Sequence, residues 1–364
     1  MKHNNKTLYQ GAEAVGRINS PLWLLLDSRH SGGIETHVLE LAAGLKQYNI
    51  NVQVVFLNNY GTHPLKVALK DKQIETISLD GSIRSLWNEI RKTSPVLIHT
   101  HGYKAGIFGR LCARLSSTPV VSTYHSGERH YGKLALYNLV DRYSAGLANK
   151  VYVVSPQIGQ RLQVDADIVK NFIATKTLEI SKGKQVAFVG RLSHEKGPDI
   201  YLQLARCFPN ESFHIYGTGT LEPALKKSAS SNVHFHGQQD NMASAWSETE
   251  LLVMPSRFEG LPMAALEAMG RGIPVIAFDV GALGHLIKSN ENGWLVEPTK
   301  IEPLSQHFQQ WLEMNPSKKE QYKHAAQNTI KQKFSTQVVM PELIHSYQKI
   351  SKLEISHNAD LDIQ

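Results

Sequence analysis

The sequence predicts an α/β protein of two domains, each built on a parallel β-sheet. The chain has 364 residues, which exceeds the usual size of a single core and favours two domains. Short apolar runs rich in Val and Ile alternate with helix-length segments along the chain, which is typical of strands buried on both faces of a parallel sheet. Charged residues make up 20% of the chain and apolar residues 41%, as in ordinary globular proteins.

The apolar runs place five predicted strands in each half of the chain. Those of the first half are Leu22–Leu26, Val52–Phe56, Val96–Thr100, Val120–Thr123 and Val151–Val154. Those of the second half are Val186–Val189, Phe213–Tyr216, Val233–Phe235, Leu251–Met254 and Pro274–Phe278. The polar segment 171–185 lies between the two sets, so we expect the domain boundary there. Ligands of open parallel sheets bind beyond the carboxyl ends of the strands, in the loops that follow them.

Charge and cysteine content limit the classes of protein that the sequence allows. Residues 1–170 hold 20 Lys and Arg against 12 Asp and Glu, whereas the remainder holds 19 against 20. A basic half can meet nucleic acid, an anionic membrane or an anionic substrate, and no aromatic-interleaved basic run or zinc-finger spacing supports nucleic acid. The two cysteines, Cys112 and Cys207, fit no disulfide framework, and residues 1–20 lack the apolar core of a signal peptide. We therefore expect a cytoplasmic protein.

The loops after the first strand of each half carry groups suited to an anionic ligand. Gly32 and Gly33 precede a helix whose free N–H groups can receive an anion, although a plain strand-to-helix turn explains the glycines equally well. In the segment GRLSHEKGPD, Arg191 offers a planar fork and Lys196 a mobile point charge, a pair suited to two phosphates. A solvated loop is the alternative for this pair, and its place after a strand favours the functional interpretation.

A further loop, YGTGTLEPALKK, carries Gly217 and Gly219 after the next strand. A dinucleotide-binding fingerprint requires a third glycine three residues later, where Glu222 stands instead. A nicotinamide-dependent oxidoreductase is therefore the least favoured class, whereas a tight turn near a nucleotide remains compatible with the two glycines.

The segment SRFEGLPMAALEAMG places Glu259 in a post-strand loop and Glu267 inside the helix that follows. Pro262 suits the first turn of this helix, and helical side chains lean toward the N-terminus, so both carboxylates can approach the space before it. The N–H groups that can receive phosphate oxygens there are those near Gly260, Leu261 and Met263. Carboxylates repel a diphosphate, so we expect them to bind the hydroxyl groups beside it, an arrangement that fits a sugar nucleotide.

Five motifs resemble, in the expected order, those of the retaining GT-B glycosyltransferases of family 4. They are SGGIETHVLELAAGL, STYHSG, VKNFI, GRLSHEKGPD and the E-x7-E segment EGLPMAALEAMGRGIPVIAFDVGALGHLI, and the resemblance spans roughly residues 22–350. It implies two Rossmann-like domains facing a cleft: an acceptor domain over 21–175 and a sugar-nucleotide domain over 176–335. It also implies that a helix over 336–352 returns to the first domain. Polar segments, 1–20 and 353–364, flank these parts.

The resemblance implies a role for each matching residue. Glu259 is expected to contact the hydroxyls of the transferred sugar, Glu267 the ribose, and His125 the donor sugar. Arg191 and Lys196 are expected to stabilise the leaving diphosphate. The donor site is expected to be completed by Gly32, Gly33, Gly190, Gly217, Gly219, Gly260, Leu261 and Met263. One departure is visible, because many members read GG-x-x-E where this chain reads GALGH, with Ala282 and His285.

The implied reaction moves a sugar from a nucleoside diphosphate, which we expect to be UDP, to a hydroxyl with retention at the anomeric carbon. Attack on the front face, assisted by the leaving phosphate, needs no protein nucleophile. Neither D-x-D string, Asp165–Asp167 or Asp360–Asp362, lies in a post-strand loop of the second domain. The pairs His99/His101 and His234/His236 each lack an evident third ligand. We therefore expect neither a metal nor another cofactor.

One helix predicted in the first half, YKAGIFGRLCARLSS, bears on the acceptor. An apolar stripe is formed by Ile107, Phe108, Leu111, Cys112 and Leu115, and Lys104, Arg110 and Arg114 lie off it. The helix either faces the core with a solvated basic side, or docks on an anionic membrane at the inner face of the cell. A lipid-linked intermediate of lipopolysaccharide, capsule or exopolysaccharide synthesis would suit the second interpretation. Two other functions stay open: a nucleotide-sugar epimerase or hydrolase, and a non-catalytic sugar-nucleotide sensor.

Overall fold

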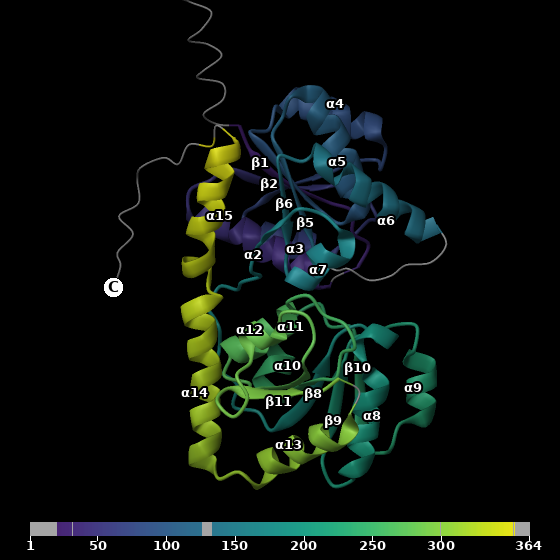
Figure 1. The fold of residues 1–364 in the computed structure, drawn as a ribbon, viewed down its shortest axis with the longest axis vertical. Helices are drawn as coiled ribbons and strands as arrows, with labels where there is room; N and C mark the ends of the chain where they lie inside the picture. Colours follow the sequence, from purple (N-terminus) through teal and green to yellow (C-terminus); the bar gives the residue numbers. More distant parts are fainter. Residues whose placement is uncertain (1–19, 31, 126–132, 299, 352, 354–364) are drawn as a thin grey trace, which may run out of the picture.

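The computed structural model describes residues 20–30, 32–125, 133–298, 300–351 and 353, which form two α/β domains, one above the other in Figure 1. The first sheet has the strand order β3-β2-β1-β4-β5-β6-β7 and the second β10-β9-β8-β11-β12-β13, and the neighbouring strands are parallel. The strands of the first sheet are β1 (Leu22–Leu26), β2 (Val52–Phe56), β3 (Glu75–Ser78), β4 (Leu97–His101), β5 (Val120–Tyr124), β6 (Lys150–Val153) and β7 (Asp167–Ile168). Those of the second sheet are β8 (Gln185–Val189), β9 (Phe213–Tyr216), β10 (Val233–Gly237), β11 (Thr249–Met254), β12 (Val275–Phe278) and β13 (Gly293–Val296).

Helices connect the strands and cover the sheets. The first domain contains α2 (Gly33–Gln47), α3 (Pro64–Asp71), α4 (Ile83–Thr93), α5 (Tyr103–Ser116), α6 (Lys133–Ser144), the 3-10 turn η1 (Ala145–Leu147) and α7 (Pro156–Leu162). The second contains the 3-10 turn η2 (His194–Lys196), α8 (Pro198–Cys207), α9 (Glu222–Ser228), α10 (Ala243–Glu248), α11 (Met263–Gly270), α12 (Leu283–Leu286) and α13 (Ile301–Glu313). The chain continues into α14 (Pro316–Lys333) and α15 (Thr336–Ile350).

The predicted fold class is confirmed, and the ten predicted strands are present with ends shifted by at most two residues. Central strands such as β1 and β5 are buried along their whole length, which explains their continuous apolar runs. Three strands were missed. β3 and β7 lie at the edge of the first sheet and carry exposed side chains, so they lack an apolar run, and β13 is only four residues long.

The last two helices run along both domains on one side of the molecule (Figure 1). α14 packs against α11 in the second domain, and α15 packs against α2 in the first, so the final helix returns as the resemblance implied. At the crossing, Ile173 N–H donates to the carbonyl O of Phe334 at 3.0 Å, and Thr336 N–H donates to the carbonyl O of Ile173 at 3.1 Å. The two segments that connect the domains are therefore hydrogen-bonded to each other.

Arg110 of helix α5 departs from the expectation of a solvated basic side, whereas Arg114 is exposed as expected. Arg110 is 1% exposed and donates from Nη2 to Asp141 Oδ1 at 2.5 Å and from Nη1 to Ser122 Oγ at 3.0 Å. A Cβ on Gly106, one turn earlier, would lie 2.8 Å from both Arg110 Nη1 and Asp141 Oδ1, so this glycine provides the room for the ion pair. Leu115 of the expected apolar stripe is 73% exposed instead.

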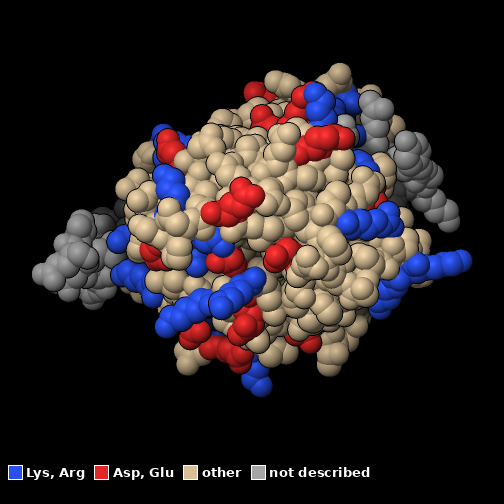
Figure 2. Space-filling view, turned by 90° about the horizontal axis from the view of Figure 1, so that it is seen from below, with Lys and Arg blue, Asp and Glu red and all other residues tan. Residues whose placement is uncertain are grey.

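The near-equal content of positive and negative residues in the second half of the sequence is also visible on the surface of the second domain. Figure 2 views the molecule from the end formed by this domain, and the Lys and Arg side chains are interspersed with Asp and Glu on that face. Such a surface lacks the continuous basic stripe that nucleic-acid binding proteins present. Within the residues described, no helix has the length and apolar character needed to cross a membrane.

Candidate active site

The carboxyl ends of the two sheets meet, and the loops that follow the strands are in direct contact. Asn171 Nδ2 donates to the carbonyl O of Leu261 at 2.6 Å. A Cβ on Gly260 would lie 2.7 Å from Val154 Cγ2 and 2.9 Å from the carbonyl O of His125, so the second domain's loop packs tightly on the ends of β5 and β6. The candidate residues of both domains therefore lie in one region.

Lys196 and Glu259 form the most direct contact among the predicted site residues. Lys196 Nζ lies 2.7 Å from each carboxylate oxygen of Glu259. Glu259 is 4% exposed, whereas the Lys196 side chain is 25% exposed. The loops that carry the two residues are joined by Arg257 N–H, which donates to the carbonyl O of Glu195 at 2.7 Å. The cation predicted to hold a phosphate is thus paired with the carboxylate predicted to bind the sugar.

Arg191 lies at the same edge of the second domain but faces a residue of the first. Burial raises the pKa of Glu35, near the start of α2, and the positive charge of Arg191 opposes this rise. Glu35 also accepts a backbone hydrogen bond from Gly32, the N-cap of α2, which is one half of a capping box. Sequence reasoning did not single out Glu35, although a Glu three residues after an N-cap is a known helix-start signal.

The glycines predicted to approach the diphosphate differ in their surroundings. Gly32 and Gly33 are exposed, and a Cβ on Gly33 would have no neighbour within 4 Å among the residues described. By contrast, a Cβ on Gly217, where φ is +134°, would lie 2.1 Å from the carbonyl O of Gly190, and one on Gly219 would lie 2.4 Å from that of Leu192. Gly217 and Gly219 thus have a packing reason to be glycine, independent of any ligand, whereas a Cβ on Gly190 would come no closer than 3.9 Å to its nearest described neighbours.

Glu267 lies in the second turn of α11 and accepts a hydrogen bond from Trp246 Nε1 at 2.8 Å. Burial raises the pKa of its carboxyl, and this hydrogen bond and the charge of Arg271 oppose the rise. The helix begins at Met263, with Pro262 as the N-cap rather than within the first turn. Met263 and Leu261 are each 4% exposed, so their side chains face the core and only their backbone could meet a ligand.

The segment GALGH, in which this chain departs from the GG-x-x-E of many family members, packs against the backbone of Glu259 and Gly260. Gly281 has φ of +63°, and a Cβ there would lie 2.2 Å from the carbonyl O of Glu259. The next residue, Ala282, donates its N–H to the carbonyl O of Gly260 at 2.8 Å. The sequence analysis did not single out Gly281, which stands three positions after the end of β12.

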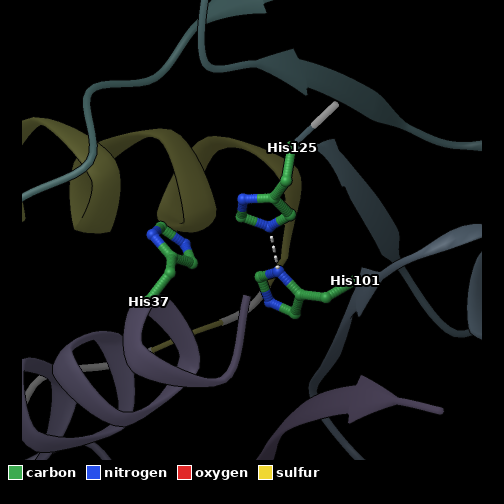
Figure 3. A group of neighbouring side chains, drawn as sticks. All are labelled: His37, His101 and His125. Atoms are coloured by element: carbon green, nitrogen blue, oxygen red, sulfur yellow. Dashed lines mark hydrogen bonds between the residues drawn. The ribbon is translucent and has the colours of Figure 1, made fainter. Parts of the chain in front are cut away.

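His125 lies in a group of histidines at the carboxyl edge of the first sheet (Figure 3). His101 Nδ1 and His125 Nε2 are 3.0 Å apart, and the ring of His37 lies 4.7 Å from that of His125 between centroids. Burial lowers the pKa of His37 to about 4 and holds those of His101 and His125 well below the ordinary value. These imidazoles are therefore neutral at neutral pH.

The sequence offered His99 as the neighbour of His101, and their ring centroids do lie 4.2 Å apart, but the fold also brings His37 and His125 to His101. The partner that the sequence offered, His99, bonds to Tyr347 Oη and Thr123 Oγ1, each at 2.7 Å. On the second sheet, His236 lies 2.9 Å from His214 on a partly exposed face. Of the two D-x-D strings, Asp165–Asp167 reaches β7 at the sheet edge, where Asp167 pairs with Lys150, and Asp360–Asp362 lies outside the described residues.

The fold and the site define a class of two-domain α/β proteins whose opposed sheet edges carry the functional groups. The model for glycosyltransferase family 4 matches residues 31–171, and the model for glycosyl transferases group 1 matches residues 169–332. The two matches together cover both domains. The chain therefore belongs to the GT-B glycosyltransferases of this group.

Relatives and solved structures agree with this family. The chain is 32% identical over 210 residues to the O-antigen biosynthesis glycosyltransferase WbnH of Escherichia coli, an alignment that covers 54% of this chain and 61% of that protein. It is 27% identical over 261 residues to the UDP-Gal:alpha-D-GlcNAc-diphosphoundecaprenol alpha-1,3-galactosyltransferase of Escherichia coli, covering 61% and 67%. The structure of HepE from Anabaena in complex with UDP-glucose matches with a TM-score of 0.78 at 18% identity, covering 90% and 99%, which shows a shared fold.

Proposed function

We propose that this protein is a retaining glycosyltransferase that moves a sugar from a UDP-sugar to a lipid-linked intermediate of surface-polysaccharide synthesis. The observation that carries the proposal is the Lys196–Glu259 pair, 2.7 Å apart, at the meeting edges of two GT-B domains. The relatives named for O-antigen synthesis and for a diphosphoundecaprenol acceptor support the choice of acceptor.

In the proposed reaction the second domain handles the charge of the donor. Lys196, together with Arg191 of the same post-strand segment, receives the diphosphate as the bond to the sugar breaks, and preorganised cations of this kind stabilise a developing negative charge. Glu259 then loses its partner and turns its oxygens to the sugar hydroxyls, while Glu267 meets the ribose. The neutral imidazole of His125 faces the sugar from the first domain without adding charge. No protein nucleophile and no metal take part in this scheme.

The proposal is tested by product analysis with a panel of nucleotide sugars and a diphosphoundecaprenol-linked acceptor. We expect acceptor-dependent transfer, with UDP-galactose tested first because of the relative's named donor, and a product whose anomeric configuration matches the donor's. The rate should be unchanged by a chelator. Donor conversion without acceptor would instead indicate an epimerase or hydrolase, and donor binding without turnover across the panel would indicate a sensor.

A membrane-facing surface is the second part of the proposal, and it rests on α6 rather than on the basic residues of α5. Exposed apolar side chains of α6 follow a helical i, i+3, i+4, i+7 pattern, in which Leu136 is 64%, Leu139 47%, Val140 42% and Tyr143 75% exposed. The helix projects from the side of the first domain (Figure 1) and packs on α5. Apolar faces of this kind, with basic neighbours such as Arg142, insert into the interface of an anionic membrane.

Vesicle sedimentation tests this surface. The protein should sediment with vesicles that contain phosphatidylglycerol and less so with neutral vesicles, and the double variant Leu136→Gln, Leu139→Gln should stay in the supernatant. Val67→Gln is the matched control, because Val67 is an exposed apolar residue of α3, 60% accessible. Sedimentation of the double variant equal to that of the control would contradict the assignment to α6.

A further inference from the structure

Three histidines from separate parts of the first domain point their rings toward one another (Figure 3). His37 comes from α2, His101 is the last residue of β4, and His125 directly follows β5. One ring nitrogen from each lies within 4.8 Å of the other two. His37 and His101 are each 1% exposed, so this is a buried group and not a chance surface cluster.

The group leaves buried ring nitrogens without partners, which is uncommon in folded proteins. Among the residues that the structure describes, neither nitrogen of His37 nor Nε2 of His101 has a hydrogen-bond partner. The amide of Asn171 lies near His37 and favours its charged form, but its Oδ1 also lacks a partner, so the two groups stop short of hydrogen-bond geometry. His99 differs, because both of its nitrogens are satisfied. A ligand that accepts one nitrogen lone pair from each histidine would give the His37 ring a partner that it lacks.

We propose that His37, His101 and His125 bind one divalent transition-metal ion of the zinc class, with a fourth position open to water. Neutral imidazole is a preferred ligand of such ions, and three histidines with one open position form a known arrangement for zinc. A zinc ion at about 2.0–2.1 Å from each nitrogen holds neighbouring nitrogens about 3.3 Å apart. Side-chain shifts of about 1.5 Å or less would therefore close the set from its present spacing.

Metal binding here is separate from the transfer reaction and has a consequence for it. His125 lies beside the Glu259 loop, since its carbonyl O would be 2.9 Å from a Cβ on Gly260. A bound metal would hold the His125 imidazole away from the sugar, so zinc should inhibit transfer. This consequence rests on the proposed function, whereas the binding itself does not.

The test is titration of the full chain with Co²⁺ alone, followed by its displacement with Zn²⁺. Four-coordinate Co²⁺ gives intense visible d–d bands, and we expect them to saturate at one equivalent. His37→Gln and His101→Gln should each abolish the bands. His236→Gln is the matched control, because His236 belongs to a histidine pair of the second domain, with its Nε2 2.9 Å from His214 Nδ1, and it should keep the bands.

Thermal unfolding supplies a second readout that does not depend on colour. Zn²⁺ should raise the melting temperature of the wild type and of His236→Gln, but not of His101→Gln, because only a native site couples binding to stability. Circular dichroism checks that the variants fold, and His101→Asn replaces any glutamine variant that does not. Weak bands typical of six-coordinate cobalt, or bands that disappear in His236→Gln and persist in His37→Gln, would overturn the site. Absence of transfer activity in the metal-free protein, with an intact cobalt spectrum on titration, would leave the metal site standing and count against the proposed function alone.

Discussion

The two sheet edges that meet at the candidate site manage charge in different ways. The edge of the second domain presents cations, and Lys196 is held by the buried carboxylate of Glu259. The edge of the first domain presents neutral imidazoles, and the N-terminus of α2 is capped by the carboxylate of Glu35. In both places an internal carboxylate occupies a position suited to an anion. Under the proposed function, a diphosphate donor would displace such a group at either edge, and the second domain offers it the stronger positive partner.

The largest effect is expected when the cation at the edge of the second domain is removed. Lys196→Ala should lower the rate of sugar transfer by about 10²- to 10³-fold, about 2.7–4 kcal/mol of barrier, because a preorganised donor to the leaving group is lost. Initial rates at saturating donor measure it. Lys226→Ala is the matched control, because Lys226 forms a surface pair with Glu222 at 2.7 Å and is 54% exposed.

Folding must be separated from catalysis in this experiment. Lys196→Ala leaves the buried Glu259 unpaired, which should cost about 3 kcal/mol of unfolding free energy. The double variant Lys196→Ala, Glu259→Gln should recover most of that stability without recovering transfer. A normal transfer rate in folded Lys196→Ala, together with a lost rate in Glu259→Gln, would contradict the phosphate role of Lys196.

A pH series tests how the neutral imidazoles at the edge of the first domain contribute to stability. Burial lowers the pKa of His37 from 6.5 to about 4. Between these two pH values His37 is protonated in the unfolded chain but neutral in the folded protein. Stability from this residue is complete above pH 6.5 and falls toward pH 4, by about 3 kcal/mol at a slope of about 1.4 kcal/mol per pH unit. Denaturant unfolding of the wild type and of His37→Gln isolates the effect, because the raised pKa values of Glu35, Glu40 and Glu267 act in the opposite sense in both proteins. Parallel curves for the two proteins would show that His37 is not the source.

A pair of glycine variants separates packing from ligand approach. Gly217→Ala should lower the unfolding free energy by about 2 kcal/mol, because its Cβ meets the carbonyl O of Gly190 and φ is positive. Gly33→Ala should leave stability nearly unchanged, since its Cβ has open space, yet weaken donor binding if a diphosphate approaches the start of α2. Thermal unfolding and donor titration distinguish the two. Equal donor affinity in Gly33→Ala and the wild type would contradict the approach of the diphosphate to the start of α2 in the first domain.

The fold could be predicted from the sequence because buried parallel strands leave continuous apolar runs, as in Leu22–Leu26. The pairing of Lys196 with Glu259, 63 positions apart, could not, since it depends on how two loops meet. Arg110 was placed on a solvated side for the same reason, because its partner Asp141 comes from another helix. The histidine group was missed because its members are far apart in the chain, and only the parallel sheet brings the ends of β4 and β5 together.

The measurement that tests the account most directly is the affinity for UDP, without sugar, in Glu259→Gln. If Glu259 holds Lys196 in the free protein and reads the sugar in the complex, neutralising it should strengthen UDP binding while abolishing sugar transfer. Isothermal titration of the wild type and of Glu259→Gln measures the first effect, and initial rates measure the second. Weaker UDP binding in Glu259→Gln than in the wild type would contradict the account, because it would make Glu259 part of the diphosphate site itself.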